Sequence, residues 1–188
     1  MPAHPDAANS MLEQYRAFLD CLTSIQIDPR LRSKFGMSDI IQNTLLEAYQ
    51  SLERIEAMDP EGRKRWLRRM LISNLRDEID KYLTGGRNVA LEEPLRSAAE
   101  KASGRLSDWL ATEDTAVGEK LIKQDRALRL VEALAQLDPR QREALILQRW
   151  HGWKLAEIAE HMRCTLGVVA GLHARGLAKL RELLPEME

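Results

Sequence analysis

The segment from Lys154 to Leu184 contains two short helical patterns with only a few residues between them. Its sequence is KLAEIAEHMRCTLGVVAGLHARGLAKLRELL. Apolar residues recur at helical spacing in both parts, and the second part begins at Thr165, a residue type that favours the N-cap position. Two short helices joined by a turn of about three residues are the pattern of a helix-turn-helix.

This segment departs from that pattern in its turn and on its surface. Arg163 stands where a glycine with left-handed backbone is common, and a non-glycine residue there costs roughly 1–2 kcal/mol. The exposed stripe of the second helix is predicted to be Gly167, Gly171, Ala174 and Ala178. Such residues cannot make the bidentate hydrogen bonds of direct base readout. Alone, this module is expected to bind DNA weakly and with little specificity.

The rest of the chain also has helical patterns, with no alternating strand pattern. Apolar residues recur at helical spacing in residues 10–27, 37–55, 63–83, 125–137 and 138–150. Ser10 and Ser38 are expected to cap the first two of these helices, and Asp138 with Pro139 is a strong helix start. The sequence predicts an all-α fold.

The predicted helices fall into two small domains, residues 10–86 and 126–186, with a partly ordered acidic linker at 87–125. The linker has weak periodicity, and between residues 92 and 119 it holds seven acidic residues against three basic ones. A chain of 188 residues is long enough for two such domains.

The net charge of −1 conceals two basic segments, residues 60–76 and 161–181. The total argues against a simple polyanion binder, whereas the two clusters are typical of nucleic-acid contacts. Solvated helix faces are the alternative explanation for each cluster.

Several classes of protein are not expected from this sequence. It contains no apolar run of about 18 residues that would span a membrane and no secretory pattern, and Cys21 and Cys164 give no disulfide framework, so a cytoplasmic location is expected. His151, His161, Cys164 and His173 lack a C-x-x-C partner, so no metal and no cofactor are expected. No catalytic motif is present, so the chain is not expected to be an enzyme.

Two stretches resemble a known family. SDIIQNTLLEAY followed by RWLRRMLISNLRDEIDKY resembles region two of bacterial sigma factors, and LDPRQREALILQRWHGWKLAEIAEHMRCTLGVVAGLHARGLAKLRELL resembles region four. The presence of these two regions alone resembles the small extracytoplasmic-function (ECF) class. DPRLRSKF, RLSDWLATED and GWKLAEIAEH are similar to a branch from planctomycete-like bacteria. The resemblance extends from about Met11 to Leu184.

The resemblance implies a protein that binds core RNA polymerase, through the clamp helices of its largest subunit and its flap, and recognises promoter DNA to initiate transcription. An anti-sigma protein or other regulator is a further partner that it allows. Asp39 and Gln42 match the motif that faces the clamp helices, and Leu46 would add an apolar contact. Judged without the resemblance, Asp39 is a helix N-terminal charge and Gln42 a solvated residue.

Asn74 and Asp77 match the segment that reads the unpaired minus-ten strand, with Glu78 as a register alternative. Trp66 would stack on a base or, as its spacing with Met70 favours, join the core. Sequence-independent attraction to phosphate would come from Arg63, Lys64, Arg65, Arg68 and Arg69.

The resemblance places the second helix of the helix-turn-helix in the major groove of the minus-thirty-five element. The residues implied in this contact are Lys154, Arg163, Thr165, Gly167, Ala170, Gly171, Ala174 and Arg175. Lys154 stands where a Ser or Thr cap is usual and would contact phosphate instead.

Two other functions remain open from the residues themselves. A stand-alone helix-turn-helix regulator would need a dimer interface, for which no heptad is present. An RNA-binding protein would be expected to interleave aromatic residues with its basic patch, and this chain does not. The small-residue stripe is also compatible with docking of a regulator or of the first domain.

Overall fold

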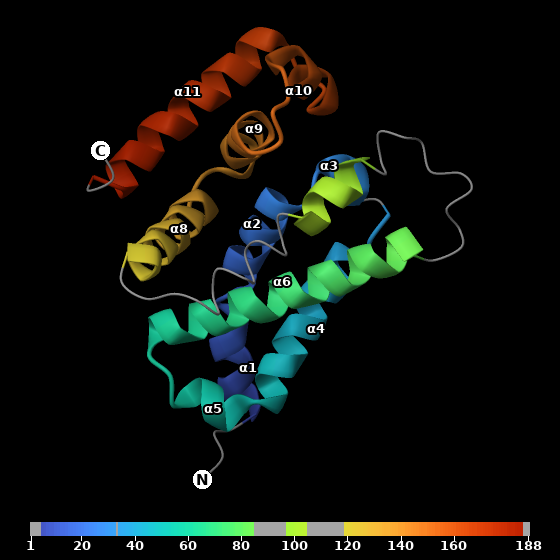
Figure 1. Cartoon of the computed structure of the whole chain (residues 1–188). Coiled ribbons are helices and arrows are strands. Elements are labelled where there is room, and N and C mark those ends of the chain that lie inside the picture. Colours follow the sequence, from blue (N-terminus) through green and yellow to red (C-terminus); the bar gives the residue numbers. More distant parts are fainter. Residues whose placement is uncertain (1–4, 33, 85–96, 105–118, 186–188) are drawn as a thin grey trace. The chain divides into compact units, whose positions relative to one another are not determined.

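The computed structural model in Figure 1 describes residues 5–32, 34–84, 97–104 and 119–185. In these residues the secondary structure is helical, with no strand, which confirms the predicted all-α fold. The chain divides into two compact units, residues 1–121 and 122–188. None of the helices described is long and apolar enough to span a membrane.

The N-terminal unit begins with two helices where the sequence predicts one. α1 (Pro5–Glu13) and α2 (Arg16–Gln26) are separated by a turn, and the Tyr15 N–H donates to the carbonyl oxygen of Leu12 at 3.0 Å. The predicted cap at Ser10 is therefore wrong, because this residue lies inside α1. Leu12, Tyr15 and Leu19 are buried, so the apolar stripe continues across the break.

The next helices are α3 (Pro29–Arg32), α4 (Met37–Gln50) and α5 (Leu52–Glu56). The N-cap of α4 is Gly36, without a side-chain cap, so Ser38 lies in the first turn and not at the cap as predicted. The buried stripe of α4 consists of Ile40, Ile41, Thr44, Leu45 and Ala48.

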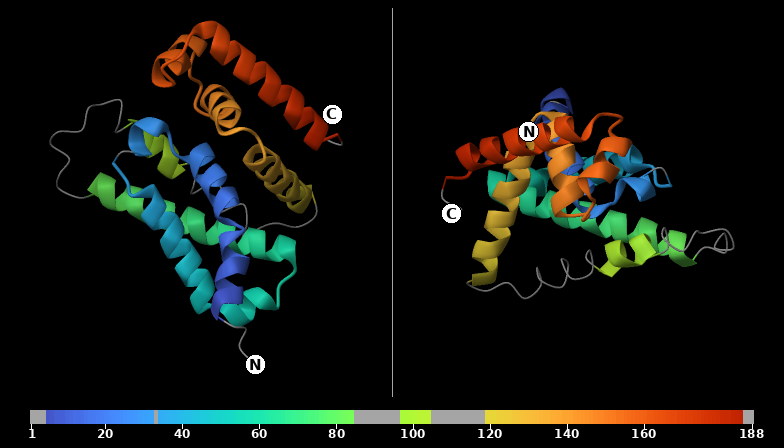
Figure 2. Two further views of the ribbon diagram at one scale, coloured as in Figure 1. Left: turned by 180° about the vertical axis from the view of Figure 1, so that it is seen from behind. Right: turned by 90° about the horizontal axis from the view of Figure 1, so that it is seen from above.

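α6 (Pro60–Thr84) is the long helix that lies against α4, as Figures 1 and 2 show. It begins before the predicted start at residue 63, because Asp59 Oδ1 accepts a hydrogen bond from the Gly62 N–H at 2.7 Å. Leu67, Leu71 and Leu75 are buried along it, and α2 packs against both α4 and α6.

Residues 97–104 form a further helix within the predicted linker, and Ser103 Oγ donates to Asp80 Oδ1 on α6 at 3.0 Å. Ala99 and Ala102 are buried. The helix at 97–104 therefore packs on the N-terminal unit. Much of the rest of the predicted linker, including Trp109, lies outside the described residues.

Most of α8 (Glu119–Ala135) lies in the C-terminal unit, together with α9 (Pro139–Arg149), α10 (Leu155–His161) and α11 (Leu166–Leu183). The predicted start of α9 is confirmed, since Asp138 accepts from the N–H groups of Arg140 and Gln141, with Pro139 at the first position. α9 lies against α11, and Ala144, Leu147, Ile158, Val169 and Leu172 form their shared core with α10.

Candidate nucleic-acid interface

α10, a tight turn and α11 form the predicted helix-turn-helix. Arg163 has a φ of +50°, which confirms the left-handed residue predicted at this position. Its N–H donates to the Glu160 carbonyl oxygen at 3.1 Å, and the Cys164 N–H donates to that of Ala159 at 2.9 Å. This pair of bonds is a Schellman ending. Cys164 packs against the core on the far side of the turn, so the turn closes without a glycine.

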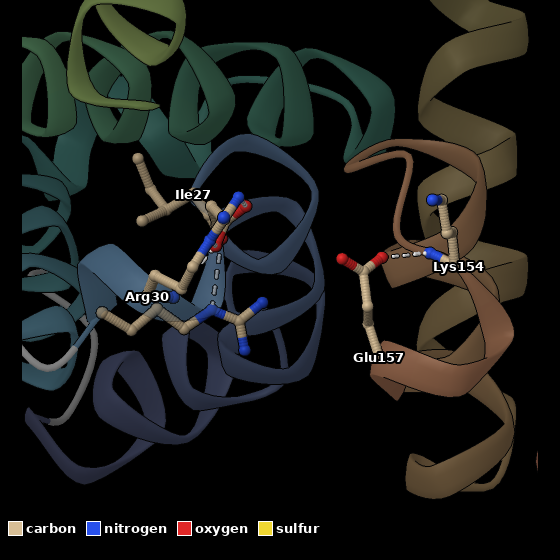
Figure 3. Close-up of polar contacts among 6 residues, drawn as sticks. Ile27, Arg30, Lys154 and Glu157 are labelled. Atoms are coloured by element: carbon tan, nitrogen blue, oxygen red, sulfur yellow. Dashed lines mark hydrogen bonds and ion pairs between the residues drawn. The ribbon is translucent and has the colours of Figure 1, made fainter. Parts of the chain in front are cut away.

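The start of α10 is capped by a residue that the sequence analysis did not single out. The backbone N–H of Lys154 donates to Glu157 Oε2 at 2.6 Å (Figure 3). The Lys154 side chain makes no cap hydrogen bond, and the residue is exposed. A Glu three residues after the N-cap is a recognisable signal in the sequence. Lys154 thus presents its ammonium group to solvent while Glu157 satisfies the backbone.

The start of α11 has the predicted cap. Thr165 Oγ1 accepts a hydrogen bond from the Val168 N–H at 3.4 Å. On one side of the helix, Val169, Leu172, Gly176 and Leu180 are buried. This orientation fixes which side of α11 faces solvent.

The solvent-facing side of α11 contains the predicted small-residue stripe: Gly167, Ala174 and Ala178 are exposed, and Gly171 is half-buried. Ala170, one of the implied DNA contacts, is also exposed. The sequence analysis missed two large apolar residues beside them, Leu166 and Val168, which are 54% and 41% exposed. The first two turns of the helix therefore offer an apolar surface.

Arg175 supplies a cation to the middle of this face. A β-carbon placed on Gly171 would lie 3.1 Å from Arg175 Nη1. The guanidinium therefore lies back along the helix over the glycine, in the direction that helical side chains lean. Arg175 and Arg163 are both exposed.

His173 lies at the edge of the same helix. Its Nε2 is buried without a hydrogen-bond partner among the described residues. Burial lowers the pKa of His173 below its ordinary value of 6.5, and the nearby cation Arg149 lowers the pKa further. The imidazole is thereby held neutral, and it supplies no positive charge to the face near neutral pH.

The basic run of α6 is only partly available to phosphate. Arg68 is buried, at 3% exposed, so its predicted role as a surface phosphate contact is wrong in this conformation. Arg63 donates to the carbonyl oxygens of Ile55 at 2.9 Å and Glu56 at 3.1 Å, which satisfies the end of α5. Lys64 pairs with Glu61 at 2.8 Å.

The remaining members of that run are Arg65, which is half-buried, and Arg69, which is exposed. Trp66 is half-buried, between the two alternatives of base stacking and core packing. Of the predicted phosphate contacts on α6, Arg69 is thus the one in an exposed position.

The structure does not bring Asn74 and Asp77 into one open site. Asn74 Nδ2 donates to Thr44 Oγ1 at 3.1 Å and to Glu47 Oε1 at 3.2 Å, both on α4. Asp77 is exposed, and the register alternative Glu78 pairs weakly with Lys81 at 3.6 Å. Asn74 therefore links α6 to α4 in this conformation.

Asp39, Gln42 and Leu46 lie exposed on α4, opposite its buried stripe. Leu46 is 52% exposed, and Tyr49, which the sequence analysis missed, is 41% exposed one turn further on. Gln42, Leu46 and Tyr49 line a groove of about 510 Å³ together with residues of α1 and with Arg16 at the start of α2. This face combines polar and apolar groups suited to a protein partner.

The histidines and cysteines do not assemble into a metal site in the part of the chain that the structure describes. His161 Nε2 lies 3.2 Å from Glu143 Oε1, and its ring packs edge-on against Trp153. His161 therefore links α10 to α9.

Comparison with known proteins finds similarity to bacterial sigma factors. Residues 127–180 match the family model described as sigma-70, region 4. The chain is 28% identical over 159 residues to the ECF RNA polymerase sigma factor SigG of Mycobacterium tuberculosis, covering 78% of this chain and 41% of that protein. It is 38% identical over 84 residues to the RNA polymerase sigma factor CarQ of Myxococcus xanthus, covering 43% of this chain and 48% of that protein.

The chain thus matches less than half the length of these curated relatives. The expected planctomycete-like branch stays a prediction. Within the C-terminal unit, residues 127–180 match sigma-70 region 4, and the chain is similar to ECF-type sigma factors.

Proposed function

We propose that this chain binds core RNA polymerase and directs it to promoters, where transcription begins, and that it acts through binding rather than catalysis. The main support is the region 4 helix-turn-helix, whose recognition helix has an exposed face flanked by Arg163 and Arg175. A protein of this function acts in the cytoplasm, where DNA and polymerase meet.

The polymerase contact is assigned to the exposed face of α4, through Asp39, Gln42 and Leu46. The opposite face of this helix is buried, so its backbone is held rigid by the core. Rigid presentation reduces the entropy lost on binding. We assign the clamp helices of the largest subunit to this face and the polymerase flap to the C-terminal unit.

The DNA contacts are assigned to both units. Lys154, Arg163 and Arg175 would pair with phosphates around the major groove, a contribution that is independent of sequence and weakens with salt. In the N-terminal unit, Asp77 and Asn74 would meet the unpaired minus-ten strand, and Asn74 would have to exchange its bonds to Thr44 and Glu47 for bonds to a base. Because both DNA-binding units belong to one polymerase-bound chain, binding of one unit raises the effective concentration of the other near the DNA, so two weak contacts together bind more tightly than either alone.

The test is co-elution with bacterial core RNA polymerase on a size-exclusion column. The wild-type chain is compared with an Asp39→Ala, Gln42→Ala double variant and with Gln50→Ala, an exposed substitution at the end of the same helix. We expect wild type and Gln50→Ala to co-elute with polymerase and the double variant to elute separately.

Failure of the wild-type chain to co-elute would overturn the proposal and favour a stand-alone helix-turn-helix regulator. Co-elution of the double variant would keep polymerase binding but move it away from Asp39 and Gln42. An anti-sigma protein competing for α4 would be detected as displacement of polymerase in the same assay.

A further inference from the structure

The N-terminal end of α11 presents apolar side chains to solvent at the place where recognition helices meet bases. Leu166 is 54% exposed and Val168 is 41% exposed. Between and after them are Gly167, Ala170 and Gly171, so residues 166–171, all of them described, include no side chain that can form a hydrogen bond. The Thr165 hydroxyl oxygen already accepts from the Val168 N–H.

The two apolar side chains flank the small residues. Successive residues on an α-helix are about 100° apart, so Leu166 and Val168 lie on either side of Gly167. Val169 and Leu172 point into the core, which turns Gly167 outward. A helix with this profile can bring its backbone close to the floor of a groove while Leu166 and Val168 contact what lies on each side.

The charges around this end of the helix favour a polyanion over an apolar protein surface. Lys154, Arg163 and Arg175 are exposed there, and residues 161–181 include no acid. In the major groove, the apolar group that distinguishes one base from the others is the C5 methyl of thymine. It is the natural partner for an exposed Leu and Val held among phosphate-binding cations.

We propose that Leu166 and Val168 recognise thymine methyl groups, so that the upstream promoter element is selected through apolar contacts and not through bidentate hydrogen bonds. This inference rests on the proposed function, since it concerns the element to which the C-terminal unit binds. It makes Leu166 and Val168 specificity-determining residues and predicts an element with T·A pairs at the positions that they touch.

The experiment uses the holoenzyme formed with core RNA polymerase and a library of duplexes randomised across the upstream element. Each thymine of the selected element is then replaced singly by deoxyuridine, which keeps the base pair and removes only the methyl group. At contacted positions we expect wild type to bind the deoxyuridine duplex about fourfold more weakly, the effect of one buried methyl-sized group.

Leu166→Ala and Val168→Ala should each bring this ratio to about one at a single, different position. Lys179→Ala, at an exposed cation about three turns further along α11, should lower the affinity for all duplexes and keep the ratio. Circular dichroism of each variant checks that α11 is intact.

Equal binding of thymine and deoxyuridine duplexes by a holoenzyme that still initiates transcription would overturn the inference and leave the proposed function standing. A ratio that persists in both alanine variants would also overturn it and would assign the apolar pair to a protein partner. If polymerase does not bind, the proposed function fails, and the same duplexes offered to the chain alone decide whether methyl recognition exists.

Discussion

The side-chain amide of Asn74 on α6 donates a hydrogen bond to Thr44 Oγ1 on α4, over 3.1 Å. The same amide also reaches Glu47 Oε1 at 3.2 Å, while Glu47 Oε2 is buried without a hydrogen-bond partner among the described residues. The residue to which we assign base recognition is therefore bound to the helix to which we assign polymerase contact. A shift of α4 on polymerase binding would therefore change the hydrogen bonds of Asn74.

Asn74→Ala should lower the free energy of unfolding of the N-terminal unit by about 1–2 kcal/mol. The substitution removes the hydrogen bonds from Asn74 Nδ2 to Thr44 Oγ1 and Glu47 Oε1, and it leaves the Glu47 carboxylate without this donor. The measurement is a urea titration, with amide hydrogen exchange in α6 to assign the loss to this unit. Asp77→Ala is the matched control, since Asp77 is exposed on the same helix and should change stability by less than about 0.5 kcal/mol. Equal stability of the two variants would contradict the structural role of Asn74.

Gly176 and Gly167 should respond in opposite directions to the same substitution. A β-carbon on Gly176 would lie 2.8 Å from Leu145 Cδ1 and 3.3 Å from Gln141 Cβ on α9, whereas one on Gly167 would meet nothing within 4 Å. Gly176→Ala should therefore destabilise the C-terminal unit by about 1–3 kcal/mol through overpacking. Gly167→Ala should stabilise it by about 0.5–1 kcal/mol through helix propensity.

Thermal unfolding of the two variants beside wild type measures this difference. Both changes add one methyl group to one helix, so each is the control for the other. A Gly176→Ala variant at least as stable as wild type would show that α9 and α11 can separate without cost.

Local signals in the sequence predicted the features that depend on neighbouring residues. Asp138, Thr165 and Arg163 act on backbone groups within a few residues, so their roles were visible in the sequence. The exposed stripe of small residues on α11 followed from helical spacing, since residues three or four apart face the same side.

Features that depend on distant packing could not be predicted in this way. The burial of Arg68 and the bonds from Asn74 to α4 involve partners far along the chain. The exposure of Leu166 and Val168 runs against hydropathy, and only the orientation of α11 on α9 reveals it. These differences concern sites that we assign to binding, where local rules are most often set aside.

Arg163→Gly should separate stability from DNA affinity. A glycine relieves the left-handed backbone strain at this position, which costs an arginine roughly 1–2 kcal/mol of stability. The glycine also makes the unfolded chain more flexible, which lowers stability by about 0.4–1 kcal/mol. The expected net gain is about 0.5–1 kcal/mol in urea unfolding. DNA binding should weaken for all sequences, with the salt dependence reduced by about one phosphate contact.

Arg163→Lys is the matched control for this change, because it keeps the cation on the same strained backbone. It should leave both stability and salt dependence close to wild type. An Arg163→Gly variant with unchanged salt dependence would remove Arg163 from the proposed phosphate contacts.

His173 should make the C-terminal unit less stable in mild acid. Burial, together with the nearby Arg149, lowers the pKa of His173 below its ordinary value of 6.5, so the unfolded chain takes up a proton at a higher pH than the folded chain does. The stability from neutral His173 is thus fully present above about pH 6.5 and is lost as pH falls through the folded-state pKa.

His173→Gln should show a flatter dependence of unfolding free energy between about pH 7.5 and 5. His161→Gln, at a histidine of the same unit that lies near Glu143, serves as the comparison. A slope that survives unchanged in His173→Gln would contradict the assignment of the acid sensitivity to His173.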